Sequence, residues 1–171
     1  MIMPNLEIER KFIIKLPINE LIEAMPEYSE SEIEQIYIKP QGVFTSRRIR
    51  RRKYKDGSLS FTETSKRRIS SISAAEAERE ICEEEYLSLS REIEDTTVPL
   101  YKTRKTFLYR SHTFELDVYP AWQTTCIMEV ELRSPDEQVD FPPELHIIRE
   151  VSGMREYSNH SMARKFPPEI I

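Results

Sequence analysis

Glycine is scarce in this sequence, which has three glycines among its 171 residues: Gly42, Gly57 and Gly153. The P-loop and the dinucleotide-binding turn both hold phosphate with several closely spaced glycines, because the backbone must come near the phosphate oxygens. These three glycines are far apart, so the sequence excludes both kinds of loop. Any phosphate bound by this protein must therefore be held by side chains.

Cysteine and long apolar runs are also scarce. Cys82 and Cys126 are far apart and outside any Cys-x-x-Cys spacing, so neither a disulfide framework nor a thiolate metal site is indicated. No apolar run approaches the length of a membrane span, and the first residues lack the pattern of a signal peptide. We expect a soluble protein of the reducing cytoplasm with no membrane partner.

Charged residues, by contrast, make up 32% of the chain, against 39% hydrophobic residues. This composition and length suit one domain, residues 1–171, with a modest core. The net charge of -5 conceals a segregation, since residues 47–55 are almost all basic and residues 76–85 are mostly acidic. The net charge therefore says little about partners.

Residues 6–12 predict a strand with an unusual charged face. Successive side chains of a strand point to opposite faces, so Glu7, Glu9 and Lys11 share one face and apolar side chains share the other. Such a charged row is ordinarily a solvated surface. It becomes informative because charged or polar residues also gather on one face of later predicted strands, in residues 34–39, 45–54, 60–66, 77–81, 101–105, 113–119 and 128–133.

The connections between these strands carry their own signals. The pair Asp56-Gly57 lies between two of the runs and predicts a hairpin, because both residues tolerate the positive φ of a tight turn. Asn19 is expected to cap a short helix, and residues 83–94 predict a second helix. Residues 66–75 are polar and predict a loop.

Two architectures fit this pattern. If the charged faces look outward, the apolar faces form an ordinary sandwich or barrel core. If a closed sheet holds the charges inside, the unpaired ones are costly unless ligands compensate them. Grouped carboxylates would then suit a hard cation such as Mg²⁺ or Mn²⁺, and the basic residues would suit a polyphosphate. Aromatic residues are sparse among the arginines, so we do not expect a nucleic-acid partner.

The order of these motifs resembles the CYTH, or triphosphate tunnel metalloenzyme, superfamily. Glu7-x-Glu9-x-Lys11 looks like the family's ExExK signature. The later motifs that follow in the family's order are Gln35-x-Tyr37, Arg48-x-Arg50, Thr64-x-Lys66, Glu78-x-Glu80, Lys102-x-Arg104, Asp117-x-Tyr119 and Glu129-x-Glu131. With residues 150–153 and 157–159, the resemblance covers nearly the whole chain.

The resemblance implies an α+β fold, a closed antiparallel barrel of about eight strands with a charged lumen and flanking helices. Residues 157–162 would plug or line one end. The implied activity is metal-dependent hydrolysis of a triphosphate, and inorganic tripolyphosphate is favoured because no base-binding segment is evident. A class IV adenylate cyclase and a nucleoside or thiamine triphosphatase are alternatives. A non-catalytic polyphosphate-binding module is the alternative of another class, although the carboxylates argue against it.

The resemblance also assigns roles to residues of this sequence. Lys11, Arg48, Arg50, Lys66, Lys102 and Arg104 would grip phosphate oxygens. Glu7, Glu9, Glu129 and Glu131 would hold Mg²⁺ or Mn²⁺, with Asp117 assisting, while Glu78 and Glu80 would orient basic side chains or a second metal and water. Lys66 or Lys102 would remove a proton, which requires a lowered pKa that nearby carboxylates oppose. The oligomeric state stays open, a homodimer included.

Two positions depart from the family's pattern, and the histidines add little. Glu63 stands where an apolar residue commonly precedes the Thr-x-Lys element, which is consistent with a surface variation. Residues 120–122, Pro-Ala-Trp, replace a glycine-containing connection and are expected to reshape the tunnel mouth. His112, His146 and His160 have no ligand-spaced partner, so we expect them to be structural or exposed.

Overall fold

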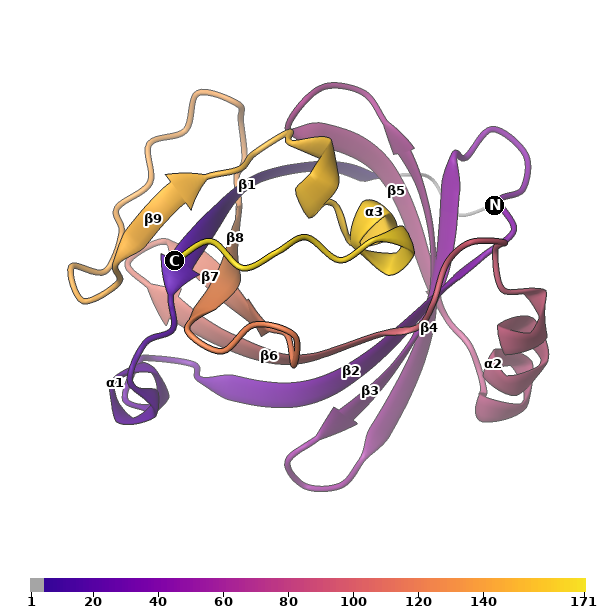
Figure 1. The fold of residues 1–171 in the computed structure, drawn as a ribbon, viewed down its shortest axis with the longest axis horizontal. Coiled ribbons are helices and arrows are strands. Elements are labelled where there is room, and N and C mark those ends of the chain that lie inside the picture. Colours follow the sequence, from indigo (N-terminus) through magenta and orange to yellow (C-terminus); the bar gives the residue numbers. More distant parts are fainter. Residues whose placement is uncertain (1–4) are drawn as a thin grey trace.

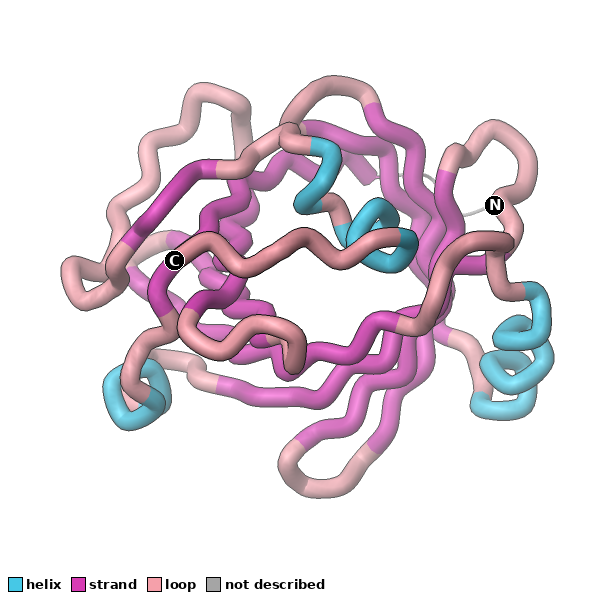
Figure 2. Tube along the Cα trace, viewed as in Figure 1, coloured by secondary structure: helices cyan, strands magenta, loops and turns pink. Residues whose placement is uncertain are grey.

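The computed structural model describes residues 5–171, and its main feature is an antiparallel sheet closed on itself (Figures 1 and 2). Its strands are β1 (Asn5–Lys15), β2 (Ser29–Ile38), β3 (Ser46–Tyr54), β4 (Leu59–Arg68), β5 (Ser73–Glu80), β6 (Leu100–Tyr109), β7 (His112–Val118), β8 (Thr125–Glu131) and β9 (Ile147–Glu150). The hydrogen-bonded order is β5-β4-β3-β2-β6-β7-β8-β1, and a β5–β1 pairing closes the ring. The expected eight-stranded antiparallel barrel is confirmed, and β9 is an additional strand that the sequence pattern did not indicate.

The helices are short; α1 (Asn19–Glu23) and α2 (Glu83–Leu89) lie outside the barrel, and α3 (Asn159–Arg164) lies at one end of it. Single 3-10 turns span Ser90–Glu92 and Arg155–Tyr157. The second predicted helix therefore ends five residues before Glu94. The expected cap by Asn19 is wrong, because Ile18 holds the cap position, and the side-chain oxygen of Asn19 instead accepts a hydrogen bond of 2.5 Å from Lys105. No helix within residues 5–171 combines the length and apolar content needed to cross a lipid bilayer.

Strand β1 is long enough to serve two partners along one edge. Residues 5–8 pair with β5 and residues 12–14 pair with β9, while its other edge pairs with β8 over residues 9–15. The register shifts between Ile13 and Ile14, where the β9 pairing is irregular. The first residues of β1 thus close the barrel by pairing with β5, and its last residues hold β9 and the C-terminal segment.

The apolar face of the sheet points outward and is covered, as the inverted pattern requires. Phe12 and Ile14 of β1 pack with Ile22 of α1 and Leu145 in one buried cluster. A second outer cluster includes Ile49 of β3 and Tyr86 of α2. Inside the barrel, apolar residues fill the end where α3 lies. We conclude that charges occupy only part of the interior.

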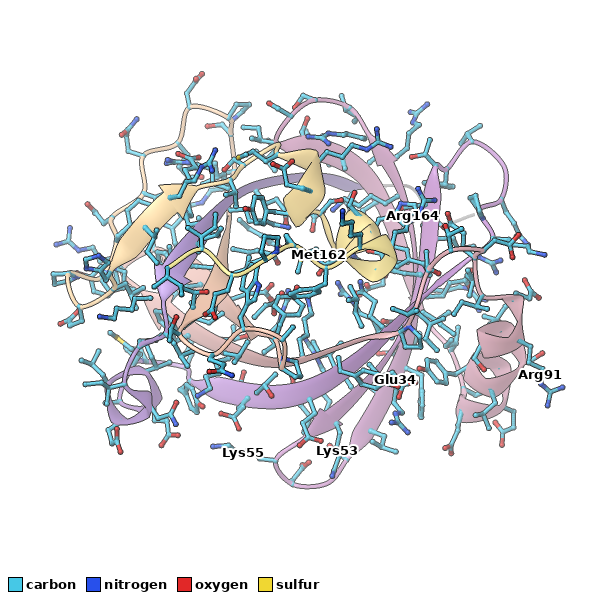
Figure 3. The ribbon with its side chains drawn as sticks, in the orientation of Figure 1. Glu34, Lys53, Lys55, Arg91, Met162 and Arg164 are labelled. Atoms are coloured by element: carbon cyan, nitrogen blue, oxygen red, sulfur yellow. The ribbon has the colours of Figure 1, made fainter. Side chains whose placement is uncertain are left out.

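Helix α3 closes that end of the barrel (Figures 1 and 3). Met162 of α3 is buried against Ile13, Tyr119 and Trp122, whose indole nitrogen donates to the carbonyl oxygen of Pro167 at 3.1 Å. Trp122 lies in the connection that departs from the family's pattern, so this departure secures the C-terminal segment. Residues 157–162 thus lie at one end of the barrel, as expected.

Glu63 lies on the outer face of β4, where the resemblance led us to expect an apolar residue. Its carboxylate is buried and pairs with Arg47 and Arg79, and Arg79 also pairs with Glu85 of α2 at 2.5 Å. An ionic cluster therefore holds α2 to the barrel at this point. The surface variation expected for Glu63 is wrong, since two cations compensate its burial.

The turns at Gly57 and Gly153 differ in how tightly they pack. The β3–β4 hairpin is confirmed, but Gly57 alone of its predicted pair has a positive φ, of 85°, and nothing lies within 4 Å of an added Cβ. Gly153 has a φ of 74°, and an added Cβ would lie 2.9 Å from the Cβ of Ser71. Ser71 belongs to the β4–β5 loop, residues 69–72, which is shorter than predicted.

We predict that Gly153→Ala destabilises the protein more than Gly57→Ala. Both changes place a Cβ at positive φ, which costs about 1–3 kcal/mol, and Gly153→Ala adds a clash with the Cβ of Ser71. Midpoints of denaturant unfolding for the two variants measure the difference. Equal losses would show that the 150–153 segment moves away from the β4–β5 loop at little cost.

Candidate active site

The barrel encloses a cavity of about 700 Å³, and its interior is crowded with side chains (Figure 3). Most of the residues expected to bind substrate or metal line it: Glu7, Glu9, Lys11, Arg48, Arg50, Lys66, Glu78, Arg104, Glu129 and Glu131. Three of them, Glu80, Lys102 and Asp117, do not. The fold therefore brings ten of the thirteen expected residues to one chamber.

Sheet order concentrates the charges in two walls, which face each other at β3 and β8 and meet where Lys66 of β4 pairs with Glu7 of β1. The acidic wall, on β1, β7 and β8, consists of Glu7, Glu9, Glu115, Glu129 and Glu131. The basic wall, on β3 and β4, consists of Arg48, Arg50, Arg52, Lys66 and Arg68. In the closed order three strands lie between β3 and β8 on either side. A ligand with a negative end and a bound cation could therefore span the chamber.

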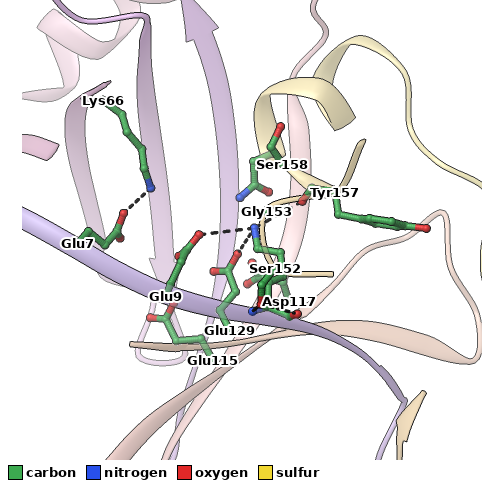
Figure 4. Close-up of polar contacts among 12 residues, drawn as sticks. Glu7, Glu9, Lys66, Glu115, Asp117, Glu129, Ser152, Gly153, Tyr157 and Ser158 are labelled. Carbon is green, nitrogen blue, oxygen red and sulfur yellow. Dashed lines mark hydrogen bonds and ion pairs between the residues drawn. The ribbon is translucent and has the colours of Figure 1, made fainter. Parts of the chain in front are cut away.

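Within the acidic wall, Glu129 is well compensated. Its carboxylate lies 2.7 Å from the amine of Lys11 and 2.9 Å from Nη2 of Arg104. Burial opposes ionisation, but these two cations hold the pKa of Glu129 well below its ordinary value. Figure 4 shows Glu9, Glu115 and Glu129 close together, with Glu7 directed to Lys66.

Glu131, two residues along the same strand, has no such compensation. Within residues 5–171 its carboxylate forms no ion pair, and neither Arg104 nor Arg133 contacts it. Glu131 is solvent-exposed at the end of β8. Partial desolvation and the carboxylates of Glu115, Glu7 and Glu9 raise its pKa. Carboxylate oxygens without a counter-ion are the donors that a hard divalent cation prefers, so this wall fits Mg²⁺ or Mn²⁺ by its chemistry.

The carboxylates are nevertheless not arranged as a ready coordination sphere. In the described part of the chain no three acidic, histidine or cysteine side chains converge tightly enough to hold an ion. Glu7 pairs with Lys66, and Glu9 lies 3.9 Å from the amine of Lys11. A cation at this wall would have to draw carboxylates away from these lysines.

Three arginines of the basic wall, Arg50, Arg52 and Arg68, form no ion pair with a carboxylate in residues 5–171, and Arg68 donates to backbone carbonyls instead. Arg48 lies 3.5 Å from Glu76, whereas Arg50 forms no ion pair with any residue of 5–171. The Nε of Arg50 instead donates to the amide oxygen of Gln35 at 2.7 Å. Burial and the neighbouring Arg48 and Arg104 lower the pKa of Arg50 to about 10. Arg50 is therefore a cation that an anionic ligand would stabilise.

The two lysines expected to remove a proton have different environments. Lys66 reaches the chamber but pairs with Glu7 and, at 3.3 Å, with Glu76; although burial lowers its pKa, Glu9 and these carboxylates raise it overall. Lys102 is fully buried outside the lining, where burial and Arg104 lower its pKa to about 7. Lys66 thus reaches the chamber without a lowered pKa, and Lys102 has a lowered pKa without reaching the chamber. That either lysine removes a proton stays a prediction.

Asp117 lies beneath the chamber wall and is fully buried. One oxygen accepts from Lys102 at 2.5 Å, and Arg104 donates to both oxygens at 2.7 Å. All strong donors around Asp117 are therefore cationic side chains of the protein. This placement suits an anchor for Lys102 and Arg104 rather than the assisting metal ligand that we expected.

Sequence reasoning missed several lining residues that period-two spacing could have found. Glu76 precedes Glu78 by two residues and pairs with Arg48 and Lys66. Glu115 precedes Asp117 by two residues and pairs with Arg104. Conversely, Glu80 is exposed beyond the lining. The acidic pair of β5 that faces the chamber is therefore Glu76 and Glu78, one step earlier than expected.

His160 of α3 also lines the chamber, which its lack of ligand spacing did not reveal. Its ring stacks on Tyr37 with centroids 4.6 Å apart, and its Nε2 lies 2.8 Å from the carboxylate of Glu94. Arg164 pairs with the same carboxylate. Glu94 therefore ties the closing helix to the segment that precedes β6.

Comparison with solved structures identifies the architecture. The inorganic triphosphatase NE1496 is 24% identical, with a TM-score of 0.56 over 95% of this chain and 97% of that one. The PH1012 protein from Pyrococcus horikoshii OT3 is 21% identical, with a TM-score of 0.52 over 75% and 80% of the two chains. The chain has the fold of the CYTH tunnel domain. The resemblance inferred from the motifs is thereby confirmed at the level of the fold.

The tunnel fold by itself does not decide the activity. A chain of the Schizosaccharomyces pombe Mediator head module, 7% identical, also aligns with a TM-score of 0.51 over 78% of this chain. No protein-family model and no curated protein sequence matches the chain. The argument for an activity must therefore come from the chamber itself.

We predict opposite effects on stability for Glu131→Gln and Glu129→Gln in chelator. Because the folded pKa of Glu131 is raised, its ionisation costs stability as the pH rises above its unfolded value, about 4.3. Glu131→Gln removes this cost and should raise the melting temperature at pH 8 but not at pH 4. The folded pKa of Glu129 is lowered, so its charge contributes stability at pH 8 that Glu129→Gln removes.

Thermal melting of both variants at the two pH values is the measurement. The pair is well matched, because both glutamates lie on the same face of β8. A Glu131→Gln protein that melts earlier than wild type at pH 8 would mean that this carboxylate has a structural partner.

Proposed function

We propose that the protein is a metal-dependent triphosphatase and that its substrate is inorganic tripolyphosphate. The observation that carries the proposal is the pair of uncompensated groups on opposite walls, Arg50 and Glu131. Arg50 is partly buried beside Arg48 and Arg104, and Glu131, although solvent-exposed, is repelled by the carboxylates around it, so each charge carries a cost in the empty chamber. A polyphosphate at the first group and a divalent cation at the second would remove both costs together.

The roles of the side chains follow from their positions. Arg48, Arg50 and Lys66 would bind phosphate oxygens from the basic wall, and Lys11 and Arg104 would bind them from the other side. These cations would neutralise charge on the transferring phosphoryl group, where such enzymes gain most of their rate. Mg²⁺ or Mn²⁺, held by Glu7, Glu9, Glu129 and Glu131, would add positive charge and make a coordinated water more acidic.

The absence of a free aromatic surface in the described lining favours an inorganic substrate over a nucleotide. The aromatic rings there are those of Tyr37, Tyr157 and His160. Tyr37 and His160 stack on each other, and Tyr157 packs in the apolar cluster around α3. A base would find no exposed ring on which to stack. The similarity to a protein described as an inorganic triphosphatase supports the same substrate.

The carboxylates separate this proposal from a non-catalytic polyphosphate-binding module. Glu131 has a raised pKa and no counter-ion, so it weakens both the fold and the binding of an anion. A module that only bound polyphosphate would gain from losing it. Binding of a divalent cation would explain why Glu131 is present, which favours a metal-dependent enzyme over a module that only binds polyphosphate.

A phosphate-release panel tests the activity. With Mg²⁺ or Mn²⁺ we expect tripolyphosphate to be hydrolysed much faster than pyrophosphate, ATP or thiamine triphosphate, and chelator to abolish release. Without metal, tripolyphosphate at a hundredfold excess over its dissociation constant should still stabilise the fold by about 2.7 kcal/mol. A melting curve that saturating tripolyphosphate does not move would contradict binding, and cyclic AMP formed from ATP would favour the cyclase.

Replacing Arg50 by lysine tests the basic wall. Lysine keeps the charge but loses the planar, two-pronged donor, so we expect kcat/KM to fall about tenfold or more with little change in stability. Arg51→Lys is the matched control, because the adjacent side chain is half exposed and pairs with Glu34 outside the chamber. Equal kinetics in both variants would argue that Arg50 does not touch substrate.

A further inference from the structure

Gln35 of β2 holds Arg50 of the basic wall through a neutral side-chain amide. It is fully buried and lies directly opposite Arg50 in the register of β2 and β3. Its Oε1 accepts from the Nε of Arg50 at 2.7 Å, and its Nε2 donates to the hydroxyl oxygen of Tyr37 at 3.1 Å. Both ends of the amide are therefore engaged.

The orientation of this amide follows from its two partners. A guanidinium has donors only, so the amide must present its oxygen to Arg50. The amide nitrogen then needs an acceptor, which the hydroxyl of Tyr37 supplies. Because the ring of Tyr37 is stacked on His160 of α3, the closing helix helps to fix the amide and, through it, Arg50.

Two other arginines of the chamber, Arg48 and Arg104, are held by carboxylates. Arg48 faces the carboxylate of Glu76 at 3.5 Å. Arg104 is bound by Asp117, Glu115 and Glu129. In both cases a carboxylate fixes the guanidinium and cancels its charge. Gln35 fixes Arg50 and leaves the charge intact.

The two terminal amino groups of Arg50 remain available. Among residues 5–171 neither Nη1 nor Nη2 of Arg50 donates a hydrogen bond, and the nearest acid on β5, Glu78, accepts instead from the hydroxyl of Thr64 at 2.7 Å. A guanidinium can grip phosphate through two parallel N–H groups. The free edge of Arg50, which lines the chamber, has the donors for such a contact.

We propose that Gln35 is a specificity-determining positioning residue, which orients Arg50 while preserving its positive charge for a phosphate group of the substrate. The inference rests on the proposed function, because it assumes that the chamber binds a polyphosphate. A carboxylate at position 35 would stabilise the empty protein, since it would cancel a buried charge. With the neutral amide, the charge of Arg50 is left to be compensated by the phosphate of the substrate.

Gln35→Glu tests this directly, because it is close in size and differs in charge. In chelator, we expect the variant to melt at a higher temperature than wild type and to bind tripolyphosphate at least about tenfold more weakly, since the new carboxylate competes for Arg50. Gln138→Glu is the matched control. It adds the same charge at an exposed position outside the chamber and should change neither quantity.

Two further variants distinguish positioning from a general structural role. Gln35→Leu keeps the charge of Arg50 but removes its acceptor, so it should lower both melting temperature and affinity. In an Arg50→Ala background, adding Gln35→Glu should weaken tripolyphosphate binding no further, because the effect acts through Arg50. Affinity is measured by calorimetric titration with tripolyphosphate in chelator, and stability by thermal melting.

The decisive result is that Gln35→Glu raises the melting temperature but weakens the binding of tripolyphosphate. The inference is overturned if this variant binds tripolyphosphate as Gln138→Glu does, if it loses stability and affinity together as Gln35→Leu does, or if it does not fold. Failure of the proposed function gives a different result, namely wild-type protein that binds no tripolyphosphate at all.

Discussion

Charges enclosed in a barrel must be compensated, and this constraint explains how the interior is built. Asp117 lies between Lys102 and Arg104, Glu129 lies between Lys11 and Arg104, and Lys66 has its own carboxylates. Each of these groups alone would be too costly to bury. Charged groups that have no such partner, Arg50 and Glu131 among them, mark where an anionic ligand and a cation would be favourable.

The same constraint determines what surrounds the barrel. Because the charged face is inside, the apolar face needs a cover, which α1, α2 and residues 139–145 supply from outside. The charged interior cannot fill itself with apolar packing, so the end away from the ligand walls is filled by α3 and the aromatic residues around Trp122. The short helices are thus a consequence of the inverted sheet.

Most strands could be predicted from alternation, because period-two spacing is a local property, whereas closure of the sheet around its charged face was implied by the family resemblance. Strand β9 could not be predicted, since its four residues have no clear alternation and form a strand only against β1. The expected site residues came from the family resemblance, and ten of those thirteen line the chamber. The exclusion of Glu80, Lys102 and Asp117 could not be foreseen, because strand tilt and register decide which residues of a charged face reach the chamber.

Compensation by pairing also bears on how the two ligands of the proposed reaction would affect each other. Glu7 and Glu76 hold Lys66, and Glu9 and Glu129 surround Lys11. Phosphate oxygens bound to these lysines would take the place of the carboxylates and release them for a divalent cation. The cation would in turn relieve the repulsion that raises the pKa of Glu131. On this function each ligand prepares the site of the other, which is reciprocal coupling without any change of fold.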